Sequence, residues 1–183
     1  MKKFELTSEF VTFLGKKLFR IKALISFGNV EEGELGGYVE KEENLSNDGN
    51  AWVYGNARVF GNARVYGDAW VYGDAEVFGN ARVYGNARVF GNARVYGDAE
   101  VFGNARVYGD ADYATVHGFG SEYRTTTFFR TKAGDIGVRC GCFYGTLEEF
   151  RAKVKETHGE TKTAKEYLMV ADLMEFRFSK EEA

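Results

Sequence analysis

Residues 51–112 read AWVYGN ARVFGN ARVYGD AWVYGD AEVFGN ARVYGN ARVFGN ARVYGD AEVFGN ARVYGD AD, so one six-residue unit recurs ten times without a break. Each unit contains Ala, a variable residue, Val, an aromatic residue, Gly, and then Asn or Asp. In an extended chain alternate side chains share a face, so Ala and Val point one way and the variable and aromatic residues the other. Gly followed by Asn or Asp tolerates left-handed backbone angles and marks a corner. The unit therefore predicts a four-residue strand and a two-residue corner, repeated as a solenoid.

The variable position decides which face of the coil is the core. This position is Arg in six of the ten units. Burying six unpaired guanidinium groups is energetically prohibitive, because each would lose its hydration and gain no opposite charge in return. Ala and Val therefore fill the core, and the variable and aromatic residues point outward.

A known family shows the same spacing. An aliphatic residue followed four places later by a small one, as in Val53 with Ala57 and Val59 with Ala63, resembles the left-handed parallel β-helix of hexapeptide-repeat proteins. The resemblance implies three units per coil, about four coils in all, and residues 18 apart stacked on one face. The expected fold is mainly β: a left-handed β-helix over residues 45–112, an N-terminal β cap over 1–44, and a C-terminal ββαα module over 113–183.

The flanking segments carry their own signals. In the cap, Phe10–Phe13 and Leu18–Leu24 are typical of two strands. In the module, Phe128–Lys132 and Ile136–Phe143 indicate a hairpin.

Two helices follow that hairpin. Thr146 and Glu149 form a capping box that opens the first helix, and Gly159 ends it. The second helix is expected from about Thr163 to Phe176. The residues expected on the inward faces of the two helices are Leu147, Phe150, Val154, Tyr167, Val170, Leu173 and Met174.

Stacking at 18 residues sorts the variable positions into three outer faces. Face one has Trp52, Trp70, Arg88 and Arg106; face two has Arg58, Glu76, Arg94 and Asp112; face three has Arg64, Arg82 and Glu100. The charges of face two alternate, which predicts ion pairs between neighbouring coils.

Face one is the predicted binding surface, together with the adjacent Tyr54 and Tyr72. Trp and Arg are the residues most enriched in binding hot spots, and they can also stack on a base and hold a phosphate. Two alternatives stay open: the aromatic rings only stack on one another along the solenoid, or the N-terminal segment covers Trp52 and Trp70.

A second polar cluster lies around the C-terminal hairpin. Arg124, Arg130 and Arg139, with Thr125, Thr126 and Thr127, could hold a phosphate. The alternative is an ordinary solvent-facing side of a small sheet.

Composition excludes several classes of protein. The net charge of −3 argues against a nucleic-acid binder. The sequence has no run of 18 apolar residues and no secretory signal, so we expect a cytoplasmic protein without a membrane span. Cys140 and Cys142 are too close for a disulfide framework and are too few ligands for a metal, and no cofactor motif occurs.

The histidines argue against catalysis. Hexapeptide acyltransferases use a His as general base, and here His117 and His158 are the only histidines. Neither lies within residues 51–112, which excludes a three-His metal site on the coils. We therefore expect no catalytic residue, no metal and no cofactor, with an acyltransferase-like enzyme kept as an alternative.

Three segments point to a biological setting. They are GGYVEKEENLS at 36–46, TTFFRTK at 126–132 and CGCFYGTLEEF at 140–150, and with the repeats they resemble uncharacterised proteins of bacteriophages and prophages. The resemblance implies a mobile element, in which a host-directed role such as counter-defence is expected. The sequence hypothesis is a non-enzymatic binding protein, in a homo-oligomer for which a trimer is favoured. It either blocks a host protein or sequesters a nucleotide signal, and a self-assembling scaffold is the alternative.

Overall fold

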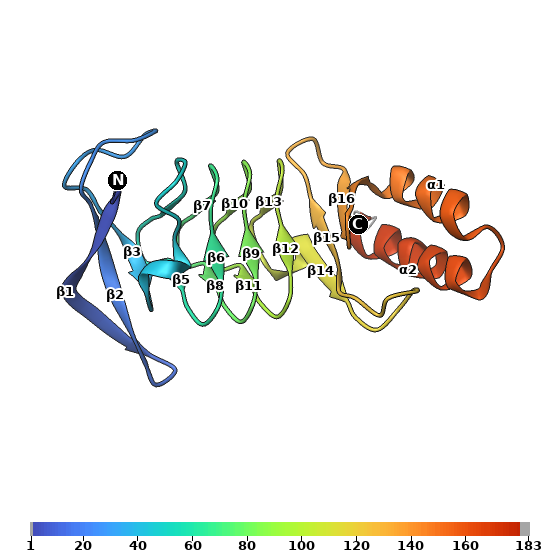
Figure 1. The fold of residues 1–183 in the computed structure, drawn as a ribbon, viewed down its shortest axis with the longest axis horizontal. Helices are drawn as coiled ribbons and strands as arrows, with labels where there is room; N and C mark the ends of the chain where they lie inside the picture. The colour runs from blue at the N-terminus through green and yellow to red at the C-terminus, as the bar shows by residue number, and fades with distance from the viewer. Residues whose placement is uncertain (1, 180–183) are drawn as a thin grey trace. The chain divides into compact units, whose positions relative to one another are not determined.

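The computed structural model describes residues 2–179. They fall into two compact units, with the boundary in the chain between Asp110 and Ala111. The first unit holds the N-terminal segment and the repeats, and the second holds the C-terminal strands and helices (Figure 1).

The repeats form a solenoid of short parallel strands. These are β4 (Trp52–Val53), β5 (Arg58–Val59), β6 (Arg64–Val65), β7 (Trp70–Val71), β8 (Glu76–Val77), β9 (Arg82–Val83), β10 (Arg88–Val89), β11 (Arg94–Val95), β12 (Glu100–Val101) and β13 (Arg106–Val107). Every third strand pairs in parallel, which gives the sheet orders β4-β7-β10-β13, β5-β8-β11 and β6-β9-β12. The pairing of Trp52 with Trp70 and of Arg88 with Arg106 confirms the 18-residue register.

The strands are shorter than the four residues expected. The aromatic residue already opens the corner, as when the Ala57 N–H donates to the Tyr54 carbonyl at 3.1 Å across Gly55 and Asn56. The glycine supplies the left-handed angle that this corner needs, with φ of +59° at Gly55.

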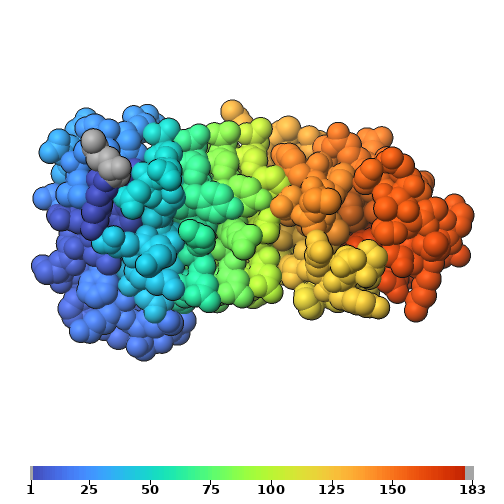
Figure 2. All heavy atoms as spheres, in the orientation of Figure 1, coloured from blue at the N-terminus to red at the C-terminus, as the bar shows by residue number. Residues whose placement is uncertain are grey.

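The solenoid core is as predicted. Every Ala of the repeat from Ala51 to Ala105 and every Val from Val53 to Val107 is 0% exposed. The outward side chains of successive coils meet as a continuous surface in Figure 2.

The N-terminal segment extends the sheet of face two. Strand β1 (Phe4–Phe13) and strand β2 (Lys16–Ala23) form a hairpin, and β2 pairs antiparallel with β3 (Leu35–Val39). Strand β3 then pairs in parallel with β5, so the solenoid sheet continues into the hairpin (Figure 1). Strand β1 is longer than the predicted strand at 10–13, because its first half pairs with β2 through residues outside the short apolar run.

Two buried polar residues close the first coil. The Lys3 ammonium donates to the carbonyls of Gly49 at 3.2 Å and Ala51 at 2.9 Å. At the end of the short helix η1 (Glu42–Asn44), the Asn44 amide donates to the carbonyl of Ala63 at 2.8 Å. Both side chains satisfy backbone carbonyls that the first coil would otherwise leave unpaired.

The C-terminal unit is a four-stranded antiparallel sheet followed by two helices. After the turn η2 (Asp110–Asp112), the strands β14 (Tyr113–Val116), β15 (Thr126–Arg130), β16 (Ile136–Cys140) and β17 (Phe143–Thr146) pair in that order. The prediction of one strand over 136–143 was wrong, because Gly141 takes φ of +57° and turns the chain between β16 and β17.

The helices are α1 (Leu147–His158) and α2 (Lys162–Phe178). The Thr146–Glu149 capping box and the Gly159 stop are confirmed. The apolar faces of the two helices pack on the sheet around Phe128 and Val138. The inward assignment of Leu173 was wrong: it is 57% exposed, because it lies about 100° around α2 from the buried Met174, outside the face that packs on the sheet. Within residues 2–179, no helix is long and apolar enough to span a membrane.

Candidate functional site

Face one is a single parallel ladder that runs along the solenoid. The ladder places Arg88 opposite Trp70 and Arg106 opposite Arg88. In-register pairing follows from the identical length of every unit, so neighbouring coils present the same position to solvent.

Trp52 does not belong to an open surface. It is 0% exposed, with the rings of Phe4 and Phe27 at 6.3 and 5.4 Å between centroids. The N-terminal segment therefore covers Trp52, so the alternative in which it covers both Trp52 and Trp70 holds for Trp52. Trp70 stays half-buried beside Tyr54, whose ring is 5.4 Å away.

Trp70, Arg88 and Arg106 form the distinctive part of face one. The Arg88 guanidinium carbon lies 3.7 Å from the Trp70 ring centroid, which is a close cation–π contact. Arg106 donates to the backbone carbonyls of Asn86 at 3.0 Å and Ala105 at 2.9 Å. Among residues 2–179, neither arginine forms an ion pair with a carboxylate.

Two arginines on the other faces have a carboxylate partner. Arg58 pairs with Glu76 at 3.3 Å, which confirms a charge pair predicted for face two, and Arg82 pairs with Glu100 at 3.5 Å. Arg88 and Arg106 are thus two like charges on adjacent strands, and neither has a carboxylate partner among the described residues. Arg64 on face three has none there either, but Arg82, with which it is in register, pairs with Glu100.

The end of face two differs from the prediction. Arg94 pairs with Asp110 at 3.0 Å and not with Asp112. Asp112 lies beyond the last coil in η2, and it pairs with Arg130 at 3.3 Å.

Two tyrosines flank the arginine ladder. Burial raises the pKa of Tyr72, and the nearby Arg88 acts in the opposite direction. Burial, reinforced by Glu34, also raises the pKa of Tyr54. Both hydroxyls therefore stay protonated at neutral pH and can donate hydrogen bonds beside the guanidinium of Arg88.

Ring stacking accounts for most aromatics on the remaining faces. On face two Phe60, Phe78 and Tyr96 stack at 5.0 and 5.2 Å. Beside face three the Tyr66 and Tyr84 rings stack at 4.7 Å. These ladders fit the alternative in which the aromatics serve the solenoid itself.

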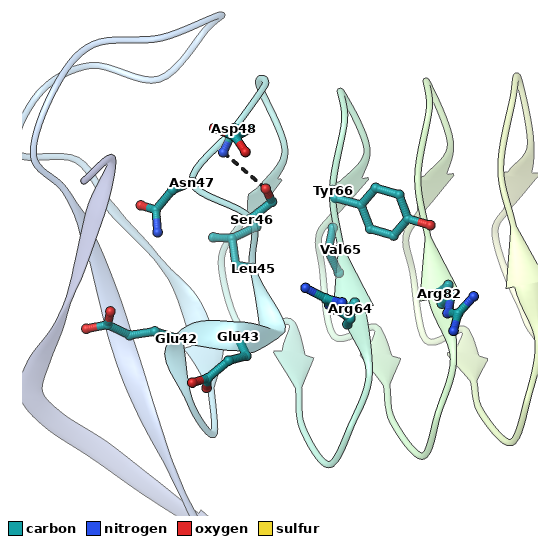
Figure 3. A pocket seen from close by; sticks show the side chains of 10 residues that line it. All are labelled: Glu42, Glu43, Leu45, Ser46, Asn47, Asp48, Arg64, Val65, Tyr66 and Arg82. Carbon is teal, nitrogen blue, oxygen red and sulfur yellow. Dashed lines mark hydrogen bonds between the residues drawn. The ribbon is translucent and has the colours of Figure 1, made fainter. Parts of the chain in front are cut away.

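A groove that the sequence did not predict lies at the start of face three. It has a volume of about 710 Å³, between residues 42–48 and the outward side chains of Arg64, Tyr66 and Arg82. Figure 3 shows the two arginines on neighbouring coils and Glu42 and Glu43 on the segment before the solenoid. The acidic run at 40–43 was the sequence signal for one side of this groove. The sequence alone could not place that run over face three, because its position depends on how η1 and the following loop fold back.

The three C-terminal arginines do not converge on one site. Arg130 is held by Asp112 and by the Phe178 carbonyl, to which it donates at 2.6 Å, so it serves the fold. Arg139 neighbours the buried Val138 on β16 and therefore lies on the opposite side of the sheet from Arg130. Arg124 lies apart from both, at the rim of a separate pocket.

The remaining candidates are His117, Cys140 and Cys142. His117 contacts the Thr125 hydroxyl at 3.0 Å and lines neither the groove nor the pocket. Cys140 and Cys142 are free thiols. Within the described part of the chain, no three His, Cys, Asp or Glu side chains cluster as metal ligands.

Comparison with known proteins agrees with the fold. A family model described as the YdcK β-solenoid repeat matches residues 51–67, 57–73, 75–89, 81–97 and 87–101. All of these ranges lie within the coils that carry β4 to β12. No match was found among curated proteins. The matched repeats and the stacked coils together make this chain a β-solenoid repeat protein.

Proposed function

We propose that this chain is a non-enzymatic binding protein that captures an anionic group of its partner on the face-one surface formed by Trp70, Arg88 and Arg106. One observation carries the proposal: Arg88 and Arg106 are stacked in register and neither has a carboxylate partner among the described residues, whereas in the in-register pair Arg64 and Arg82 the second arginine pairs with Glu100.

The physical argument rests on the electrostatics of that pair. Like charges directly opposite each other on paired strands are destabilising, so the solenoid maintains Arg88 and Arg106 at a cost. A bound phosphate or carboxylate removes the repulsion and accepts their hydrogen bonds. The contact with Trp70 fixes the Arg88 guanidinium before binding, which lowers the entropy lost when the anion arrives.

Two partner classes fit this chemistry. One is an acidic patch of a host protein, and the other is a nucleotide-like molecule whose phosphate meets the arginines. The face of the Trp70 ring is already covered by Arg88, whose guanidinium carbon lies 3.7 Å from the ring centroid. The partner is therefore recognised by the two arginines and not by stacking on a free tryptophan ring.

The wider setting belongs to the same proposal. The resemblance to phage and prophage proteins supports a host-directed role such as counter-defence in the cytoplasm of an infected cell. The hexad spacing supports a left-handed coil of the hexapeptide type.

We also propose a homo-oligomer, with a trimer favoured. An exposed apolar stripe on α2 supports it, formed by Met169, Leu173 and Phe176 on the side opposite the core.

The experiment is calorimetric titration of the full chain at low salt with guanosine monophosphate and with an oligoglutamate peptide. The test variant is Arg88→Gln/Arg106→Gln. The matched control is Arg64→Gln/Arg82→Gln, which neutralises the in-register arginine pair of face three. We expect binding of at least one probe to weaken about tenfold or more in the test variant and less than about twofold in the control. Equal losses in both variants, or no binding of either probe to the wild type, would refute the proposal.

A further inference from the structure

The C-terminal unit contains a pocket that has no part in the function proposed for face one. It has a volume of about 280 Å³ and lies between the loop before β15, the turn from β16 to β17, and helix α1. Its size is just below the range for small-molecule sites, roughly 300–1,000 Å³.

The floor of the pocket is apolar. Phe150 and Val154 are buried in the core of the unit and project from α1. The Phe150 ring contacts the rings of Phe143 and Tyr167 at 5.5 and 5.7 Å between centroids. Phe150, packed between these two rings, gives the pocket a preformed apolar surface for a flat group.

One wall of the pocket is a loop that contains several left-handed residues. Gly118, Gly120 and Tyr123 all take left-handed angles, with φ of +84°, +78° and +51°. A Cβ at Gly120 would overlap the Tyr167 ring, so only glycine lets the loop approach α2 this closely. Glycine adopts such angles without strain, so of the three only Tyr123 is in a strained conformation. The loop places Arg124 at the pocket rim.

The rim carries two cationic side chains, Arg124 and Lys153, together with one carboxylate among the lining residues, Glu122. Arg124 lies 3.6 Å from Glu122, and Lys153 lies 3.0 Å from Glu156, with all four side chains well exposed. Exposed pairs of this kind contribute little, so a ligand carboxylate can replace either partner.

We propose that this pocket binds a small aromatic carboxylate, with its ring on Phe143 and Phe150 and its charge between Arg124 and Lys153. The apolar floor selects the flat body, and the cationic rim selects one negative charge over a neutral or positive head. This site is separate from face one, so either proposal can fail without the other.

The test is NMR titration of the ¹⁵N-labelled full chain with benzoate and phenylacetate. Benzamide and benzylamine serve as the neutral and cationic counterparts of the same shape. We expect saturable shifts at Cys142, Phe143 and Thr157, with the carboxylates binding about tenfold or more tightly than benzamide. No saturable shift with either carboxylate, or equal affinities for benzoate and benzamide, would overturn the proposal.

Three variants locate the binding. Arg124→Gln is expected to weaken benzoate about fivefold or more, whereas Lys155→Gln, which removes a charge from α1 outside the pocket, leaves the affinity within about twofold. Thr157→Trp adds a ring at the exposed mouth and is expected to abolish the shifts while the rest of the spectrum keeps its dispersion. Benzoate binding that survives Thr157→Trp, or that responds equally to Arg124→Gln and Lys155→Gln, would contradict the assignment.

Discussion

The stacking of the coils can be measured by adding one methyl group at two corners of equal backbone geometry. Gly85 and Gly97 take φ of +66° and +65°, so alanine incurs the same left-handed penalty at both, about 1 kcal/mol. A Cβ at Gly97 meets nothing within 4 Å. At Gly85 the same atom lies 3.0 Å from the backbone nitrogen of Gly103 on the next coil, and backbone cannot move aside cheaply.

The two substitutions should therefore separate in stability. We expect Gly97→Ala to lower the free energy of unfolding by about 1 kcal/mol. Gly85→Ala should lower the free energy of unfolding by a further amount of about 1–3 kcal/mol, which is the usual penalty of overpacking. Urea unfolding followed by far-ultraviolet circular dichroism measures both. Equal losses at the two corners would refute the inter-coil contact, and the model of stacked corners with it.

Three further predictions concern buried or paired side chains. Burial lowers the pKa of Lys3 from 10.5 to about 8, so between these values the unfolded chain binds more protons and the stability should rise with pH. Thermal unfolding at a series of pH values should show this rise, by at most about 3 kcal/mol, and the Lys3→Met variant should lack it. Asn44→Ala removes two hydrogen bonds to solenoid carbonyls, at 3.1 and 2.8 Å, and should destabilise the chain by about 2–3 kcal/mol in urea unfolding; a loss below about 0.5 kcal/mol would contradict its capping role. Arg130→Met should loosen the end of α2, because it loses the bond to the Phe178 carbonyl; hydrogen exchange at the last turn should accelerate, and unchanged exchange would argue against the contact.

Much of the solenoid could be predicted because its information is local and repeated. One unit fixes the alternation of Ala and Val with outward residues, and identical unit length fixes the register that pairs Arg88 with Arg106. The capping box at Thr146 is local in the same way, since its donors and acceptors lie within three residues of each other.

The rest depends on segments that meet only in the folded chain. Trp52 looks like Trp70 in the repeat, and its burial follows from Phe4 and Phe27, which carry no periodic signal. Leu173 was misplaced because the side of α2 that faces the core depends on the sheet beneath it. Arg130 and Arg139 are close in sequence terms, yet the alternation of β15 and β16 places them on opposite sides.

The central claim is that Arg88 and Arg106 on face one hold an anion. The most direct measurement follows the arginine Nε–Hε resonances of the full chain while guanosine monophosphate is added at low salt. The account predicts saturable shifts of the Arg88 and Arg106 signals with a common affinity, while those of Arg64 and Arg94 stay within the change caused by ionic strength alone. Shifts shared by all the arginines in proportion to concentration, or confined to arginines outside face one, would contradict it.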